Sequence, residues 1–154
     1  PFERALTTGA AADRTELRLD KVLFNIIVDN FLSNGFKYGD VSRPPSLGLI
    51  VEPLDKDATR VRLSLELRNW AGPEHAALLQ IGEEELNEIA HAEGGRAHER
   101  AAEVSSGDGF PMAVAAASAL GGTVRLELLS DGVLAKLELP DVLVVLPGPA
   151  RGDA

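Results

Sequence analysis

The chain has 154 residues and a formal net charge of −9, and 45% of its residues are apolar. This size suits one domain with a substantial core, and the composition is that of a globular protein rather than a disordered one. No apolar run approaches the roughly 18 residues of a membrane span, so we expect no direct membrane contact. The negative charge, without a basic stripe, would repel DNA or RNA phosphates, so we expect no nucleic-acid partner. The absence of cysteine excludes disulfides and thiolate metal ligands.

The first half of the chain predicts one long helix between short strands. Residues 15–20 (TELRLD) alternate briefly and predict a short strand. Asp20 is then the expected N-cap of a helix over residues 20–38. After a loop rich in glycine and proline, residues 47–53 and 59–69 predict two strands joined by a hairpin connection, and the second strand alternates cleanly.

The second half predicts a helix and a hairpin after an acidic segment. Residues 70–82 contain a turn and about one helical turn. Residues 82–106 are rich in acidic side chains and predict a mobile segment. An alanine-rich helix is predicted over residues 110–120, where two glycines end it. An Asp-Gly pair then marks a hairpin between two strands within residues 123–140.

This order of elements predicts an α/β (α+β) fold: a two-layer sandwich with a mixed β-sheet and helices packed on one of its faces. We expect a weakly ordered segment at residues 1–15 and a single domain over residues 16–140. Residues 141–154 predict an extra strand and a disordered tail. Because the chain begins with proline, we interpret it as an excised piece of a longer protein, and we expect a cytoplasmic protein or the cytoplasmic domain of a larger sensor.

A polar stripe runs along the first predicted helix. Asn30, Asn34 and Lys37 fall on one side of it, with Tyr38 at the edge. Buried polar groups without partners cost about 1–3 kcal/mol, so these side chains need them. Carboxamide oxygens suit Mg²⁺ carrying waters and a substrate phosphate, and lysine suits the same phosphate. Hydrogen bonding to neighbouring loops is the alternative, and the sequence leaves both open. The opposite side is the expected buried face: Phe24, Val28, Leu32 and Gly35.

The second predicted helix has a glycine-rich start. Gly107 and Gly109 precede it, and Pro111 falls in its first turn, where proline is tolerated. The start of a helix exposes backbone N–H groups and the positive end of the helix dipole, so it suits an anion such as phosphate. A flexible joint before a helix is the alternative interpretation.

Taken in this order, the two features resemble the catalytic, ATP-binding domain of sensor histidine kinases, which belongs to the larger GHKL superfamily. Residues 20–39 (DKVLFNIIVDNFLSNGFKYG) are similar to the N box of that family. Residues 107–140 are similar to its second glycine box, the helix that follows and the last hairpin. The resemblance covers about residues 17–140 and implies a Bergerat-type ATP-binding fold.

The resemblance also implies roles for the polar stripe. Asn30 and Asn34 would hold Mg²⁺ and the triphosphate of ATP. Lys37 would contact phosphate, and Tyr38 would lie near the sugar or base of the nucleotide. The expected cofactors are therefore ATP and magnesium.

Residues 82–106 would be the ATP lid of such a domain. Arg96, His98 and Arg100 are the candidates there for phosphate contact; a solvated charged face is the alternative, and it is favoured for His98 more than for the arginines. The second glycine box would bring three further residues to the nucleotide: Gly107, Gly109 and Phe110.

Both glycine boxes depart from the family pattern. Asn69 is the best candidate for the position of the aspartate that accepts from the adenine amino group, and Gly72 stands where a glycine is expected. An amide oxygen can accept the same hydrogen bond without the charge that strengthens it. Trp70 either packs on the base or fills the core. Pro111 replaces the third glycine of the second box and removes one backbone N–H from the phosphate cradle.

The chemistry implied is phosphoryl transfer rather than hydrolysis. ATP-hydrolysing members place a glutamate four residues before the second asparagine as a general base, and here that position is Asn30. Kinase-type transfer needs mainly positioning and charge neutralisation. The leading interpretation is a sensor histidine kinase domain, an ATP-dependent phosphotransferase. It has no catalytic residue of its own and phosphorylates a histidine on a separate helical dimerisation domain, which passes the phosphate to a response-regulator receiver. The alternative is a degenerate domain with weak or no nucleotide binding that acts as a signalling interaction module.

Overall fold

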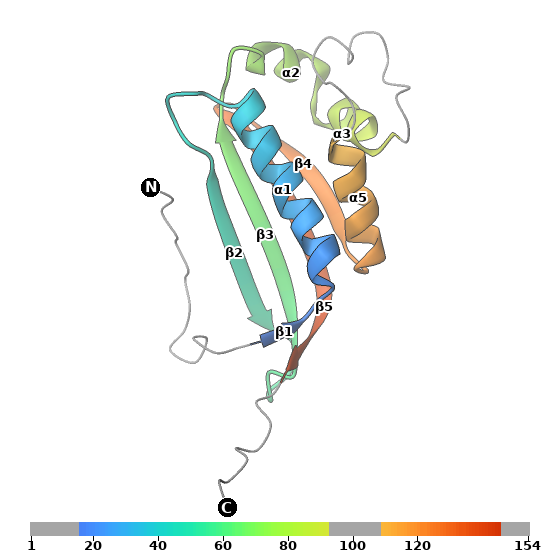
Figure 1. Ribbon diagram of the computed structural model, residues 1–154. Helices are drawn as coiled ribbons and strands as arrows, with labels where there is room; N and C mark the ends of the chain where they lie inside the picture. Colours follow the sequence, from blue (N-terminus) through green and yellow to red (C-terminus); the bar gives the residue numbers. More distant parts are fainter. Residues whose placement is uncertain (1–15, 93–108, 146–154) are drawn as a thin grey trace, which may run out of the picture.

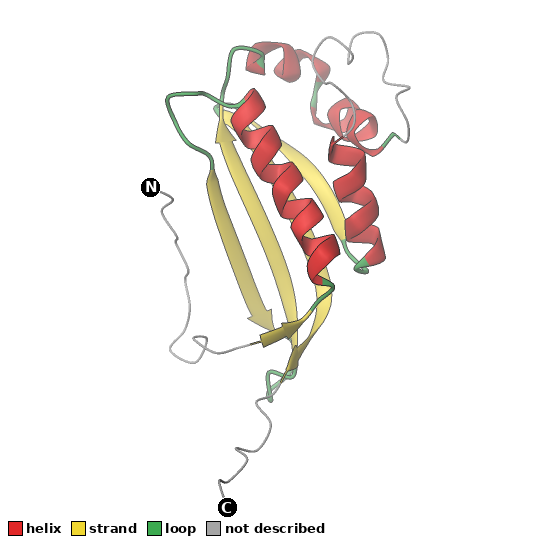
Figure 2. Ribbon diagram, viewed as in Figure 1, coloured by secondary structure: helices red, strands yellow, loops and turns green. Residues whose placement is uncertain are grey.

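Antiparallel strands form a curled sheet, and helices lie against one of its faces in the computed structural model, which describes residues 16–92 and 109–145 (Figures 1 and 2). The strands are β1 (Glu16–Arg18), β2 (Ser46–Pro53), β3 (Arg60–Trp70), β4 (Thr123–Leu129) and β5 (Gly132–Val145). The helices are α1 (Lys21–Tyr38), α2 (His75–Ile81), α3 (Glu83–His91) and α5 (Gly109–Ala119). The two-layer α+β arrangement that the sequence predicts is therefore present.

The sheet is antiparallel rather than mixed within the described residues. Its order is β2-β3-β5, and β5 pairs along its other edge with both β4 and β1. β3 and β4 run in the same direction, but β5 lies between them, so they form no parallel pair. The prediction of a mixed sheet is wrong. The pattern within one strand predicts that the strand exists, but the direction of its partner depends on packing between segments that are distant in sequence.

The core lies between the sheet and the two longer helices. Alternate residues of β3 and β5 point toward the helices, with Leu65 opposite Leu137 across the two strands. Small residues on the inner face of α5 let that helix approach α1 and the sheet closely. The largest fully buried side chains are Phe31, Ile27, Leu63, Leu137 and Leu139.

Helix α1 begins and ends as the sequence predicts. The Asp20 carboxylate accepts hydrogen bonds from the N–H groups of Val22 (2.9 Å) and Leu23 (3.1 Å), which confirms the expected N-cap. At the other end, the Gly39 N–H donates to the Gly35 carbonyl oxygen at 3.2 Å. The most buried positions are Ile27, Phe31 and Gly35, whereas the other residues of the expected apolar face are half-buried against the core.

Three further segments differ from the sequence-based expectation. Residues 75–81 form a complete short helix, α2, instead of one turn. The acidic segment 82–106 starts with the helix α3, and its residues from 93 onward lie outside the described part of the chain. The expected extra strand after residue 140 is the continuation of β5, which runs to Val145 without a break. Residues 1–15 and 146–154, where loose ends were expected, are also outside the described part.

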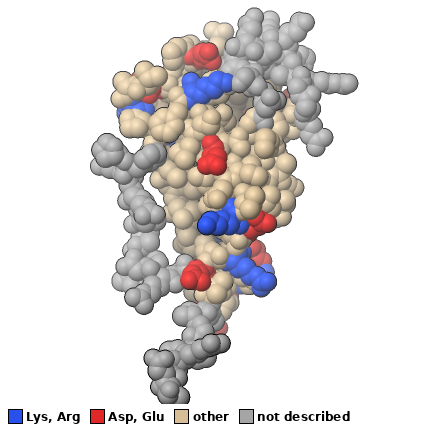
Figure 3. Space-filling model, viewed as in Figure 1, with Lys and Arg blue, Asp and Glu red and all other residues tan. Residues whose placement is uncertain are grey.

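The two faces of the sheet differ in charge. On the face without helices, Lys136 forms a cross-strand ion pair with Glu66 at 3.4 Å and a second ion pair at 3.3 Å with Glu138, two residues along its own strand. Hydrogen bonding to Glu138 and to Glu66 raises the pKa of Lys136, against the opposing effect of burial. On the helical face, most of the described surface carries neither charge, and some of the few acidic and basic side chains lie side by side near its lower end (Figure 3). Among the described residues, no helix combines the length and apolarity needed to cross a membrane.

Candidate functional site

The two asparagines of α1 face the start of α5. Helices α1 and α5 pack side by side (Figure 1). A Cβ atom placed on Gly109 would lie 2.6 Å from Asn30 Oδ1 and 3.9 Å from Asn34 Oδ1. Both amide oxygens are therefore turned toward the first residue of α5. The fold brings together the polar stripe and the glycine-rich helix start, which the sequence showed only as separate features.

The amide of Asn30 is held by its own helix. Its Nδ2 donates to the Ile26 carbonyl oxygen at 2.7 Å, which fixes the side-chain plane and leaves Oδ1 on the Gly109 side. Asn34 is half-buried, and its side chain makes no hydrogen bond to the described residues. The alternative was that both asparagines hydrogen-bond to nearby loops. Among the described residues, Asn30 instead bonds to its own helix, through its nitrogen alone, and Asn34 bonds to none of them.

Gly109 and Phe110 set the distance between α5 and α1. Because a side chain on Gly109 would meet Asn30 at 2.6 Å, only glycine permits this approach without displacement. The Phe110 ring stacks on Phe31, with centroids 6.2 Å apart and planes 9° from parallel. The side chain of Phe110 thus anchors the helix start in the core, and its contribution to a ligand would come from the backbone.

The start of α5 offers fewer donors than a helix start usually does. The first four N–H groups of an α-helix lack partners within the helix and point outward along its axis. Pro111 is the third residue of α5, so one of these four donors is missing. The helix tolerates the proline there, but any anion bound at this end would lose one hydrogen bond.

Lys37 and Tyr38 lie in the last turn of α1. The Lys37 ammonium lies 4.9 Å from the centroid of the Tyr38 ring, within range of a cation–π interaction. Lys37 is exposed, and it lies one helical turn beyond Asn34 on the same side. The helical spacing thus puts Lys37 on the same side of α1 as the two asparagines.

Asn69 is engaged within the sheet. Its Oδ1 accepts the Val133 N–H at 2.9 Å, so the oxygen that the resemblance assigns to the adenine amino group already has a partner. Gly72 follows β3 where the chain passes the end of α1, and a side chain there would collide with the Tyr38 carbonyl oxygen. The region of the first glycine box therefore joins α1 to β3 and β5, and the second lone pair of the Asn69 oxygen is not used by this contact.

Trp70 lies outside the buried core between the sheet and the helices, and two arginines lie against its ring. The Arg43 guanidinium lies 3.5 Å from the centroid of its ring, and that of Arg68 lies 4.4 Å away. Arg68 also donates to both carboxylate oxygens of Asp131, at 2.9 and 2.8 Å. The two roles that the sequence suggested for Trp70 did not include contacts with arginine. Arg43 lies far from Trp70 along the chain, whereas Arg68, two residues before it on β3, falls on the same face of the strand.

The expected lid residues are only partly visible. Arg96, His98, Arg100 and Gly107 lie outside the described residues, so the structure places none of them. The start of the segment, α3, is attached to the edge of β4: Asn87 donates from Nδ2 to the Leu126 carbonyl oxygen and accepts the Leu126 N–H at Oδ1, both at 2.8 Å. No pattern in the sequence indicates these contacts, since polar residues on an acidic helix are usually solvated.

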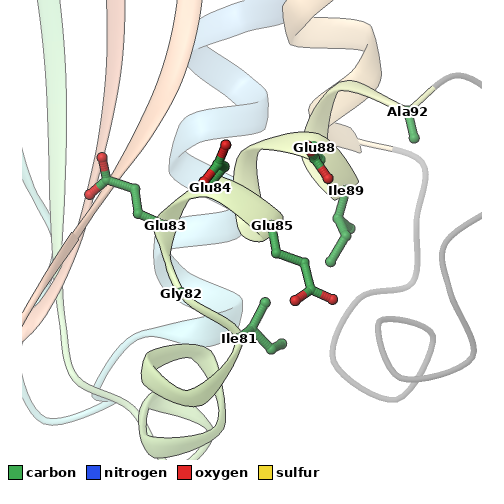
Figure 4. A pocket seen from close by; sticks show the side chains of 8 residues that line it. All are labelled: Ile81, Gly82, Glu83, Glu84, Glu85, Glu88, Ile89 and Ala92. Carbon is green, nitrogen blue, oxygen red and sulfur yellow. The ribbon is translucent and has the colours of Figure 1, made fainter.

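A separate pocket lies beside α2 and α3. Its volume is about 580 Å³, and it is lined by Ile81, Gly82, Glu83, Glu84, Glu85, Glu88, Ile89 and Ala92 (Figure 4). Four glutamates in the wall disfavour a triphosphate, and none of the predicted binding residues lines it. The asparagine pair, not this pocket, remains the candidate site.

A cation held at the asparagine pair would be only partly coordinated by protein. In the described residues, no group of three or more His, Cys, Asp or Glu side chains is arranged to hold a metal ion. Mg²⁺ keeps several waters and takes substrate phosphate as a ligand, so two amide oxygens fit such a site. A scan against models of known protein families finds no match for this chain, and a search of curated proteins finds none either.

Proposed function

We propose that this domain binds Mg-ATP between α1 and the start of α5 and serves as the catalytic domain of a sensor histidine kinase with a Bergerat-type fold. The observation that carries the proposal is the convergence of the Asn30 and Asn34 oxygens on Gly109. Amide oxygens suit Mg²⁺, and the adjoining helix start suits a phosphate. Lys37, one turn further along α1, adds a positive charge on the same side.

Each residue of the site has a positioning role in this proposal. Asn30 and Asn34 hold the magnesium ion, and the N–H groups of α5 and Lys37 hold the phosphates. When bound, magnesium would supply the charge neutralisation that phosphoryl transfer from ATP to a histidine needs. No carboxylate stands at position 30 to activate water, which disfavours hydrolysis. The acceptor histidine belongs to a separate dimerisation domain, and a response-regulator receiver then takes the phosphoryl group in the cytoplasm.

Two observations favour a second candidate, a degenerate domain that keeps the fold for signalling contacts. The Oδ1 of Asn69 is already bound by the Val133 N–H, and Pro111 removes a donor from the helix start. The donor lost at Pro111 weakens phosphate binding by about 1 kcal/mol or more, and the uncharged Asn69 amide, which the Val133 N–H already shares, accepts from adenine more weakly than an aspartate would. The two candidates share a fold and differ in whether Mg-ATP binds.

Calorimetric titration with Mg-ATP separates the two candidates. The unmodified domain should bind, and Asn34→Ala should weaken binding at least tenfold, about 1.4 kcal/mol, because it removes one of the two metal ligands. Asn25→Ala is the matched control, since Asn25 is an exposed asparagine of the same helix. Equal affinity in Asn34→Ala and Asn25→Ala would remove the metal assignment, and no binding by the folded unmodified domain would establish the degenerate alternative.

A further inference from the structure

Strand β2 lies at one edge of the sheet and pairs only with β3 among the strands that the structure describes (Figure 1). Leu54, the residue after β2, donates its N–H to the Arg60 carbonyl oxygen at 2.9 Å, so the even-numbered residues of β2 direct their backbone groups toward β3. The odd-numbered residues direct theirs away from the sheet. The outward N–H groups are those of Leu47, Leu49 and Val51, and no hydrogen bond joins them to another described residue.

This edge lacks the features that usually prevent edge strands from pairing. Such strands are commonly protected by lysine, by proline, by a bulge or by a covering segment. The eight residues of β2 (SLGLIVEP) include one charged side chain, Glu52, which pairs with Arg62 on β3 at 3.7 Å, and their only proline is the last residue. The ladder with β3 continues over all eight residues without a bulge. Ile50 and Val51 are 46% and 42% exposed, so β2 presents an apolar edge to a further strand.

Two prolines bound the outward donors symmetrically. Pro45 precedes β2 and Pro53 ends it, neither has an N–H, and Leu49 lies midway between them. An antiparallel copy of β2 centred on Leu49 places Leu47 opposite Val51 and Leu49 opposite itself. Every outward N–H then meets an outward carbonyl oxygen, and the paired side chains are all apolar. A shift of two residues in either direction puts a proline opposite an outward residue and leaves carbonyl oxygens unpaired.

The same register matches the side chains on the face without helices. Ile50 lies opposite Gly48 of the second copy. A Cβ atom on Gly48 would have the Glu66 carbonyl oxygen as its nearest neighbour, 3.9 Å away, so packing against the described residues does not require glycine there. Glycine inside a strand often marks the close approach of another segment, and here Ile50 of the second copy covers it. Glu52 lies opposite Ser46, which keeps the two Glu52 carboxylates at opposite ends of the contact.

We propose that β2 is a homodimerisation strand: two copies of this chain pair antiparallel about Leu49 and join their sheets into one. The contact is made by the same residues on both copies, so it closes as a two-fold dimer and does not propagate into a fibre. Side chains that lie opposite each other across antiparallel strands share one face of the sheet. Both copies therefore place α1 and its asparagine pair on the same face, and the pairing does not depend on nucleotide binding.

Sedimentation equilibrium of the complete chain tests the dimer. Each chain carries a net charge of −9, so the measurement is made at about 0.15 M salt, where the Debye length is about 8 Å. The weight-average mass should rise with protein concentration from the 16.3 kDa of one chain toward twice that value. A monomer at every concentration would overturn the proposal. If the amides of Leu47, Leu49 and Val51 are protected from exchange in that monomer, a segment of the same chain covers the edge instead.

A matched pair of valine-to-proline variants assigns the contact to β2. Val51→Pro replaces an outward N–H with a ring that meets the second copy, and β3 does not use that N–H, so the fold tolerates it. Its dimer dissociation constant should be at least about tenfold higher. Val41→Pro is the control, because Val41 is 97% exposed in the turn closed by the Arg43 N–H and the Asp40 carbonyl oxygen (3.0 Å), where proline is favoured. Equal dissociation constants in the two folded variants would exclude β2.

Disulfide trapping tests the register. The chain has no cysteine, so only introduced thiols can react. Gly48 and Ile50 of opposite copies form a pair without hydrogen bonds, with Cα atoms about 4.5 Å apart, whereas like positions are about 7–8 Å apart. A mixture of Gly48→Cys and Ile50→Cys should therefore form a covalent dimer at least about tenfold faster than either variant alone. Faster reaction of one variant with itself, or no covalent dimer in the mixture, would overturn the pairing about Leu49.

Discussion

At the scale of single residues, the candidate site depends on how closely two backbones approach. Gly109 allows the start of α5 to come within reach of the Asn30 oxygen, and Gly72 allows the chain after β3 to pass the Tyr38 carbonyl. Side chains at either position would occupy space that other atoms already fill. The site is therefore sensitive to changes of one methyl group.

Gly109→Ala tests this sensitivity. In a helix, alanine is normally more stable than glycine by about 1 kcal/mol. Here the added methyl group meets Asn30 Oδ1, so we expect a loss of about 1–3 kcal/mol of unfolding free energy and weaker Mg-ATP binding. Urea denaturation and calorimetry measure the two effects. Gly48→Ala is the matched control because the nearest atom to its added Cβ would be 3.9 Å away; stability unchanged or raised in Gly109→Ala would contradict the packing argument.

At the scale of the elements, side-chain-to-backbone hydrogen bonds fix where strands and helices end or turn. Asp20 caps α1, Asn69 joins β3 to β5, and α3 closes the edge of β4. In the β2–β3 connection, Asp55 accepts the Thr59 N–H at 2.8 Å and the Thr59 hydroxyl at 2.6 Å. Each of these polar groups satisfies backbone donors that the regular elements leave open.

The β2–β3 connection should give an acid-dependent stability. The hydrogen bond from the Thr59 side chain lowers the pKa of Asp55 below its usual value. A group whose pKa is lower in the folded state stabilises the fold above its unfolded pKa, about 3.9, and loses this contribution as pH falls through the folded value. Urea midpoints of the unmodified protein and of Asp55→Asn should therefore converge between pH 5 and pH 2. A difference that stays constant, or one shared by the control Asp57→Asn, would refute this assignment.

At the scale of the whole molecule, most elements could be predicted from local patterns. The N-cap at Asp20, the alternation of β3 and the Asp-Gly hairpin are all encoded within a few residues, and the structure confirms them. The antiparallel pairing and the length of β5 depend on partners far along the chain, so the sequence did not reveal them. The sequence did not predict helix α3, because its many acidic residues suggested a mobile segment. The helix is stabilised by hydrogen bonds to β4, which the sequence does not reveal.

The sequence predicted the separate elements of the candidate site but not how they come together in the fold. The spacing of Asn30 and Asn34 placed them on one side of α1 from sequence alone. Two other contacts depend on the packing of elements that are distant in sequence: Gly109 lies against these asparagines, and the Val133 N–H donates to the Asn69 oxygen. The contact of Gly109 with the asparagines is thus the strongest support for the proposed site. The contact of Asn69 with Val133 is an argument against full affinity for a nucleotide.

Paramagnetic broadening by Mn²⁺ and ATP tests the proposed metal position most directly, because Mn²⁺ takes the same oxygen ligands as Mg²⁺. In NMR spectra of the unmodified domain, Mn-ATP should broaden the side-chain amides of Asn30 and Asn34 and the backbone amide of Gly109. The side-chain amides of Asn25 and Asn87 should stay sharp. Broadening that is centred instead on the glutamates of α3, or no broadening at all, would contradict the proposal that the two asparagines hold a metal–nucleotide complex.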